Sequence, residues 1–226
     1  MEKELGIICA EGFSFFGNTN RLISHELKNI LAIISETLGL ADELMELNER
    51  GVKMKPGKLQ SLNASVIEEV DRANLIIRNM NTLAHSVDRG IEELDINQMA
   101  ALIIKISQLN PSLRNTEISL QETEPCHVHS NPFFLMTLFH HAMNFALANA
   151  GPDRKISISI SPRAYGAKVS FSGIVFKSES FPPMEVKALA KALSAVVSSD
   201  VSLGELHFEF PEIVAESAIK DLFPTD

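Results

Sequence analysis

The sequence has little of what would place it among disulfide-rich, membrane-spanning or nucleic-acid-binding proteins. Its two cysteines, Cys9 and Cys126, lie far apart without metal-site spacing, so we expect free thiols in the reducing cytoplasm. No run of about 18 apolar residues occurs, and the N-terminus lacks the features of a secretion signal, so we expect no membrane partner. A net charge of −9 leaves no clustered basic surface, which excludes nucleic acid as an expected partner.

What the chain does have is apolar content, 45% of 226 residues, which suffices for one large domain or two small ones. Helical periodicity fills residues 1–89, and mixed elements follow Arg89 and Gly90. We therefore predict an α+β protein with a helical hairpin at residues 1–89 and an α/β sandwich at residues 90–226.

The first long helix is predicted from about Asn20 to Asn48, after the cap-type residues 18–20. Residues 1–16, interrupted by Gly6 and Gly12, are predicted to be a lead-in that packs on the hairpin. At about 100° per residue, one stripe of the helix is apolar and faces away from His25; it consists of Leu27, Ile30, Leu31, Ile34, Leu38, Ala41 and Met45. We expect the His25 imidazole to be exposed.

The second long helix follows a turn at Gly51–Gly57. Its apolar positions recur in alternating steps of four and three, with Glu69 as the one polar interruption, at Leu62, Val66, Glu69, Ala73, Ile76, Met80 and Leu83. Two such helices cannot enclose a core as a single pair. We therefore predict a homodimer in which two hairpins form a four-helix bundle.

The remainder of the chain alternates between strand and helix patterns. Strands are predicted at 94–96, 117–121, 126–129, 155–161, 167–172 and 206–210, and the two at 155–161 and 167–172 form a hairpin. Helices are predicted at 97–109, 133–150, 182–197 and 211–223. The first of these helices is expected to begin at a cap residue, Asn97.

The segment Ser24-His25-Glu26-Leu27-Lys28-Asn29 resembles the phosphoacceptor box of sensor histidine kinases. The match includes Leu31 and departs at Ile30, where the family usually has a proline that costs on the order of 3 kcal/mol inside a helix. We expect a straighter helix here. The order of elements after residue 90 resembles the ATPase domain of the same family.

The resemblance implies roles for four residues of the box. His25 is the phosphoacceptor, and Glu26 matches the acid that orients the imidazole and takes its proton. Asn29 matches the position that helps to place a hydrolytic water in bifunctional kinases. A neutral imidazole is a competent nucleophile at cytoplasmic pH, and Lys28 can offset the charge of the transferred group.

A docking surface for a partner is predicted beside the histidine, at Ala32, Ile33, Glu36 and Leu40. By helical step, Ile33 and Leu40 lie about 80° and 60° from His25, outside the apolar stripe. Exposed apolar side chains beside a reactive group are typical of an interaction site. The alternative is that they pack on the second helix or on residues 1–16.

The resemblance also implies what an ATP site would need, and most of it is missing. Asn144 matches the magnesium-binding asparagine, but His140 stands where a second asparagine is usual. The segment 171–175 has no aspartate in place of the Asp-Gly turn, and Gly204 is the only glycine beyond Gly173. We expect Asn144 to be a vestige, this chain to hold no cofactor or metal, and Mg²⁺ to reside on a partner receiver domain.

Together these features resemble the dimeric histidine phosphotransferases of phosphorelays. The prediction is a cytoplasmic protein that passes a phosphoryl group through His25 to or from the aspartate of a response regulator without using ATP. His25 comes early in the chain, so the signal is expected from another protein, such as an upstream kinase. Two alternatives stay open: a divergent histidine kinase that still binds ATP, and a non-catalytic dimeric scaffold or kinase inhibitor.

Overall fold

The computed structural model describes residues 2–113, 115–121, 124–176 and 181–214. The contacts of the chain define two compact units, one from Met1–Thr19 with Leu83–Asp226 and the other from Asn20–Thr82. None of the helices within the described ranges combines the length and the apolar character needed to cross a membrane. The predicted domain ranges, 1–89 and 90–226, stay predictions.

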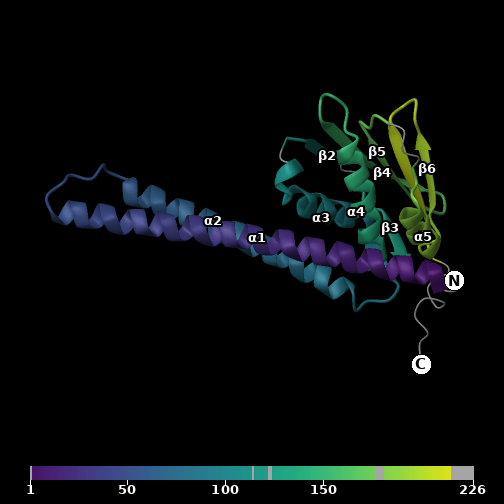
Figure 1. Ribbon diagram of the computed structural model, residues 1–226, viewed down its shortest axis with the longest axis horizontal. Coiled ribbons are helices and arrows are strands. Elements are labelled where there is room, and N and C mark those ends of the chain that lie inside the picture. The colour runs from purple at the N-terminus through teal and green to yellow at the C-terminus, as the bar shows by residue number, and fades with distance from the viewer. Residues whose placement is uncertain (1, 114, 122–123, 177–180, 215–226) are drawn as a thin grey trace. The chain divides into compact units, whose positions relative to one another are not determined.

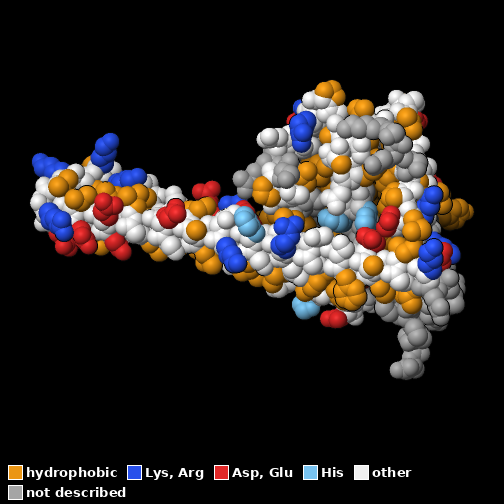
Figure 2. Space-filling view, viewed as in Figure 1, with side chains coloured by type: hydrophobic (Ala, Val, Ile, Leu, Met, Phe, Trp, Pro, Cys, Tyr) orange, Lys and Arg blue, Asp and Glu red, His pale blue; other side chains and the backbone are white. Residues whose placement is uncertain are grey.

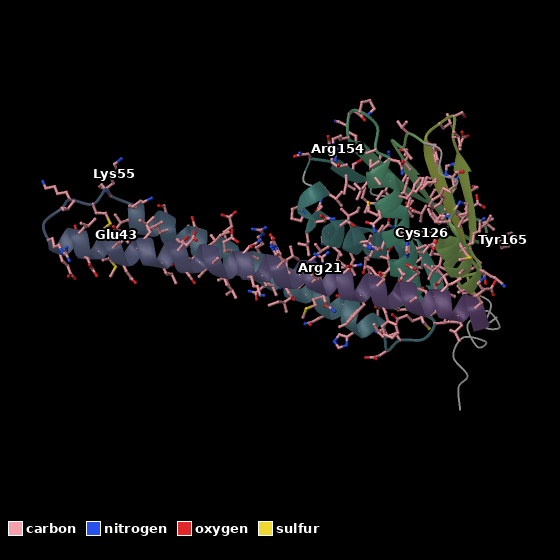
Figure 3. All side chains as sticks on the ribbon, in the orientation of Figure 1. Arg21, Glu43, Lys55, Cys126, Arg154 and Tyr165 are labelled. Atoms are coloured by element: carbon pink, nitrogen blue, oxygen red, sulfur yellow. The ribbon has the colours of Figure 1, made fainter. Side chains whose placement is uncertain are left out.

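Two long helices, α1 (Glu2–Glu49) and α2 (Lys58–Ser86), are shown in Figure 1, and the hairpin unit contains α1 from Asn20 onward and α2 up to Thr82. The stripe predicted on α2 faces inward, because Leu62 and Ile76 are buried and Val66 and Ala73 are half-buried. Polar side chains near the turn, such as Glu43 and Lys55, are exposed (Figure 3). The periodicity of the second helix is thus confirmed.

The beginning of α1 differs from the prediction, because the helix starts at Glu2 and runs through the expected lead-in and caps. This early part packs on the sandwich: the ring centre of Phe15 lies 6.0 Å from that of Phe133, and Glu4 forms an ion pair of 2.9 Å with Lys191. Gly12 does not break the helix. A Cβ there would come within 2.8 Å of the Phe133 ring, so glycine permits the close approach.

The sandwich contains a five-stranded sheet in the order β2-β4-β5-β7-β6 and a two-stranded sheet of β1 and β3. Three helices contact the larger sheet (Figure 1): α3 (Ile96–Gln108), α4 (Pro132–Ala148) and α5 (Met184–Ala192). The strands are β1 (Glu92–Asp95), β2 (Glu117–Gln121), β3 (His127–Ser130), β4 (Lys155–Arg163), β5 (Gly166–Ser172), β6 (Val196–Asp200) and β7 (Glu205–Pro211). The predicted α+β class with N-terminal helices and an α/β sandwich is confirmed.

Alternation along the central strands builds the core of the sandwich. Ile156, Ile158 and Ile160 of β4 are each 1% exposed, whereas the serines between them are half-buried on the other face. β4 pairs antiparallel with β5, and β5 pairs antiparallel with β7, so that their apolar side chains share one face of the sheet. The predicted hairpin is confirmed, and its turn at Ala164 and Tyr165 leaves Tyr165 exposed (Figure 3).

Several predicted boundaries need correction. Asp95, not Asn97, caps α3, because its side chain accepts a hydrogen bond of 2.9 Å from the Asn97 amide. The helix predicted to reach Val197 ends at Ala192, and the edge strand β6 follows. Residues 215–223 of the predicted last helix lie outside the described part of the chain, and Pro211 belongs to β7.

Candidate functional site

His25 lies on the exposed side of α1, as the helical spacing predicts. Its Nδ1 atom is 3.3 Å from the side-chain amide nitrogen, Nδ2, of Asn29, which lies one helical turn further along. Lys28 is also exposed, and Arg21 lies on the turn before the histidine (Figure 3). The imidazole is therefore accessible, and Asn29 contacts one of its two ring nitrogens.

Glu26 is turned inward, away from solvent, with 5% of its side chain exposed. It shares the inward stripe with Ile23 and Ile30, three residues before it and four after it, which are both almost completely buried. Its Oε1 accepts a hydrogen bond from Arg72 Nη2 of α2, and its Oε2 accepts one of 3.3 Å from Asn29. These bonds pair the buried carboxylate with a cation, as burial of a charge requires.

Arg72 is a member of this site that the sequence prediction missed. It also binds Glu69 Oε2 at 3.3 Å, so one guanidinium joins a carboxylate of each helix of the hairpin. A signal was present, because Glu69 is the polar interruption of the α2 stripe and Arg72 follows it by three residues. Charged residues at that spacing lie on the same side of a helix.

The predicted docking residues are all exposed in the hairpin unit. Ile33 is 39% exposed and Leu40 is 41% exposed, and Ala32 and Glu36 also face solvent. Neither apolar side chain is buried against α2, so the surface is available beside His25. Further exposed apolar side chains lie along the hairpin (Figure 2), among them Leu31, Leu38, Met45, Ile67 and Leu75.

Asn144 is exposed on α4, and its amide nitrogen lies 2.9 Å from His140 Nε2. His140 packs on Phe15, with 4.8 Å between the ring centres, and burial lowers its pKa to about 4, helped by the neighbouring His141. His141 contacts Glu11 of α1 at 3.2 Å. The early part of α1 therefore packs on the two histidines beside Asn144.

Gly173 and Gly204, the two glycines considered above for a nucleotide site, both lie where the backbone requires glycine. Both have positive φ, of 92° and 69°. A Cβ at Gly173 would lie 2.1 Å from the Lys155 carbonyl oxygen, and one at Gly204 would lie 2.4 Å from the Ile174 carbonyl oxygen. Each glycine thus permits a close backbone approach at the end of a strand.

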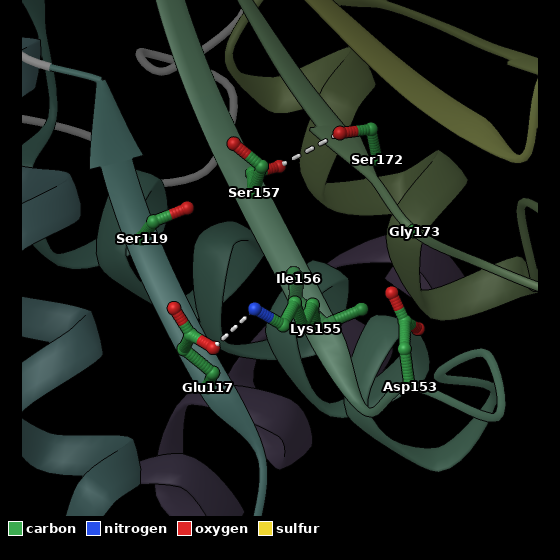
Figure 4. Close-up of a pocket in the computed structure, with 8 residues that line it drawn as sticks. All are labelled: Glu117, Ser119, Asp153, Lys155, Ile156, Ser157, Ser172 and Gly173. Carbon is green, nitrogen blue, oxygen red and sulfur yellow. Dashed lines mark hydrogen bonds and ion pairs between the residues drawn. The ribbon is translucent and has the colours of Figure 1, made fainter.

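A small, open hollow of about 240 Å³ lies on the sheet of the sandwich (Figure 4). Glu117 of β2 and Lys155 of β4 form an ion pair of 2.8 Å along it, and Ser157 and Ser172 line its other part. Ser172 and Gly173 of the segment 171–175 line the hollow, whereas His25, the other residues of its box and Asn144 do not. Within the described ranges, no group of three or more His, Cys, Asp or Glu side chains is arranged to hold a metal ion.

Comparison with known proteins gives matches among solved structures, whereas no family model and no curated protein matches the chain. The catalytic domain of the histidine kinase ThkA aligns over 56% of this chain and 100% of its own, at 12% identity and a TM-score of 0.45. The ATP-binding domain of PrrB from Mycobacterium tuberculosis aligns over 55% and 98%, at 16% identity and a TM-score of 0.46. The Acinetobacter baumannii histidine kinase AdeS aligns over 83% and 98%, at 15% identity and a TM-score of 0.46.

Proposed function

We propose that this chain is a histidine–aspartate phosphotransferase of two-component signalling that acts through His25 in the cytoplasm. The observation that carries the proposal is an exposed imidazole within the Ser24–Asn29 box on a helical hairpin. Phosphoryl transfer depends mainly on positioning and charge stabilisation, and a nucleophile on a rigid helix meets the first requirement.

The reaction exchanges one phosphorus bond for another. A ring nitrogen of His25 attacks the phosphorus of an aspartyl phosphate, forming the N–P bond while the bond to the aspartate oxygen breaks. The aspartate leaves as a carboxylate, and the ring releases its N–H proton to water. Mg²⁺ held by the receiver domain stabilises the charge of the transferred group, and Lys28 adds a cation from this chain.

Asn29 and Glu26 support the acceptor in different ways. Asn29 contacts the imidazole and is close enough to orient a water for hydrolysis of the phosphorylated partner, which would give a phosphatase activity. The Glu26 carboxylate is bound by Arg72 and Asn29, so in this arrangement it acts on His25 through Asn29. A receiver domain would dock on Ala32, Ile33, Glu36 and Leu40.

Several features support action without ATP. Segment 171–175 carries no aspartate to bind adenine, and Gly173 and Gly204 are needed for close backbone contacts rather than for wrapping phosphates. Asn144 is engaged with His140, while Phe15 packs on His140 and Glu11 contacts the neighbouring His141. On this proposal the sandwich serves as a docking and structural module.

A homodimer is part of the proposal. Apolar side chains exposed on both helices of the single hairpin, such as Leu31 and Ile67, would be buried between two copies. Pairing of two hairpins is the usual way to cover such a surface in a four-helix bundle. Sedimentation equilibrium of the full chain measures this directly, and a monomer would contradict it.

Incubation with a panel of phosphorylated receiver domains tests the function. We expect labelled phosphate to move from at least one receiver to the wild-type chain and not to His25→Gln. Labelled ATP serves as the second arm: incorporation at His25 from ATP alone would identify a kinase with a divergent nucleotide site. Label from neither donor, with receivers still bound, would identify a scaffold or inhibitor.

A further inference from the structure

A connected set of side chains within the hairpin ends at His25. Arg72 is held by Glu69 and donates to Glu26, and Glu26 accepts from the amide nitrogen of Asn29. The same amide nitrogen contacts Nδ1 of His25. We call Arg72, Glu26 and Asn29 the positioning relay.

The chemistry of the relay fixes the direction of its last bond. An ionised carboxylate only accepts hydrogen bonds, so Glu26, paired with Arg72, requires the NH₂ group of Asn29 on its side. That group has two hydrogens, and the second is in reach of His25 Nδ1. Nδ1 is then the acceptor, which places the proton of the neutral ring on Nε2.

Burial supports a positioning role for Glu26. An apolar side chain between Ile23 and Ile30 would pack in this stripe at no electrostatic cost, and a buried ion pair is seldom more stabilising than such packing. A carboxylate at this position therefore serves something other than stability. Its two oxygens accept hydrogen bonds from Arg72 and from Asn29, the other two members of the relay.

We propose that Arg72 and Glu26 are positioning residues that act through Asn29 to hold resting His25 in the tautomer protonated at Nε2. The consequence for the reaction rests on the proposed function. The Nδ1 lone pair is occupied by the amide, and Nε2 has no lone pair until its proton moves to Nδ1 by way of water. The Asn29 amide must therefore leave Nδ1 before either ring nitrogen can attack phosphorus, which makes the relay a restraint that receiver docking has to release.

Nuclear magnetic resonance of the full chain, labelled with ¹⁵N histidine, tests the tautomer without any phosphoryl donor. His25→Gln identifies the signals of His25, and spectra are recorded above the titration range of histidine. We expect wild-type His25 to show an unprotonated Nδ1 and a protonated Nε2. A wild-type ring protonated at Nδ1 would overturn the proposal, whether or not the chain transfers phosphate.

Variants of α2 test the dependence on Arg72. In Arg72→Gln we expect the ratio of Nε2–H to Nδ1–H tautomers to fall about fivefold, the equivalent of one hydrogen bond between neutral groups. Arg72→Lys retains the cation and should keep most of the wild-type ratio, which also covers the case that Arg72→Gln does not fold. Arg78→Gln, an exposed arginine of the same helix, is the control and should leave the ratio unchanged. An unchanged ratio in Arg72→Gln, or an equal change in Arg78→Gln, would overturn the proposal.

Discussion

Gly173 shows how a single residue constrains the sandwich. Its φ of 92° is strained for other residues, and a Cβ would lie 2.1 Å from the Lys155 carbonyl oxygen. We expect Gly173→Ala to lower the free energy of unfolding by about 2 kcal/mol or more, because both strain and clash contribute. Urea denaturation measures the change.

Gly6 provides the matched control in the same unit. It lies inside α1 with open space around its Cα, so Gly6→Ala should raise the free energy of unfolding by up to about 1 kcal/mol through helix propensity. Equal stabilities of Gly173→Ala and the wild type would show that the strand end does not require glycine.

His140 makes stability depend on pH. Burial lowers its pKa from 6.5 to about 4, with His141 adding to the effect. Burial also lowers the pKa of His141, although Glu11 and Glu185 favour its charged form. Between these two pH values the unfolded chain takes up a proton at residue 140 that the folded chain does not. The stabilising contribution is therefore complete above about pH 6.5 and is lost as the pH falls, by at most about 3 kcal/mol.

His140→Gln isolates this contribution from that of the carboxylates. We expect the variant to lose less free energy of unfolding than the wild type when the pH is lowered through this window. Urea denaturation at its two ends gives the comparison. An equal loss in both proteins would mean that His140 takes up its proton in the folded state as readily as in the unfolded chain.

The early part of α1 is the element that the sequence prediction described least well, and its packing can be tested. Phe15 is 2% exposed and contacts Phe133 and His140, whereas Phe13 is 79% exposed on the same helix. Phe15→Ala should cost about 3 kcal/mol of unfolding free energy, and Phe13→Ala should cost less than about 1 kcal/mol. Similar values for the two variants, measured by denaturation, would refute the docking of this segment on α4.

The exposed surface of α1 beside His25 leads to a prediction about binding. Ile33→Asp places a charge among the docking residues and should weaken receiver binding about tenfold or more, while the dimer stays intact. Val52→Asp, at a more exposed apolar position in the turn, is the control. Calorimetry measures the affinity and sedimentation the dimer; unchanged affinity for Ile33→Asp would remove the docking surface from the account.

Elements with a strong repeating pattern could be predicted from the sequence, and others could not. The isoleucine–serine alternation of β4 and the four-and-three spacing of α2 each identified an element, because burial of one face imposes the period. The predicted start of α1 was wrong because Gly12 permits a tertiary contact with Phe133, which the local sequence does not reveal. β6 was missed because its residues 196–200 do not alternate and follow directly on a helical pattern.

The candidate site follows the same division. Exposure of His25 could be predicted from its position relative to the apolar stripe. The proximity of Asn29 to His25 could be predicted because the two residues are one helical turn apart. The pairing of Glu26 with Arg72 joins two helices, so it depends on the register of the hairpin rather than on any local pattern. The polar interruption at Glu69 indicated an unusual position in the α2 stripe, but it did not identify Arg72 as the partner of Glu26.

At the scale of the whole molecule, α1 belongs to both units, with residues up to Thr19 in one and residues from Asn20 in the other. The hairpin unit carries His25, the proposed acceptor, and an exposed apolar surface, and the other unit carries the sheet. This division is consistent with the proposed function, in which the hairpin performs phosphotransfer and the sandwich supports docking. The proposed function therefore depends on chemistry at one histidine of the hairpin.

The most direct test is to map the phosphorylated residue after the full chain is mixed with phosphorylated receiver domains in the absence of nucleotide. Mass spectrometry under conditions that preserve phosphohistidine should locate the phosphoryl group on His25. It should remain detectable at His25 in His85→Gln, which alters another exposed histidine of the long helices, and disappear in His25→Gln. Phosphorylation at a different residue, or at none across the receiver panel, would contradict the account.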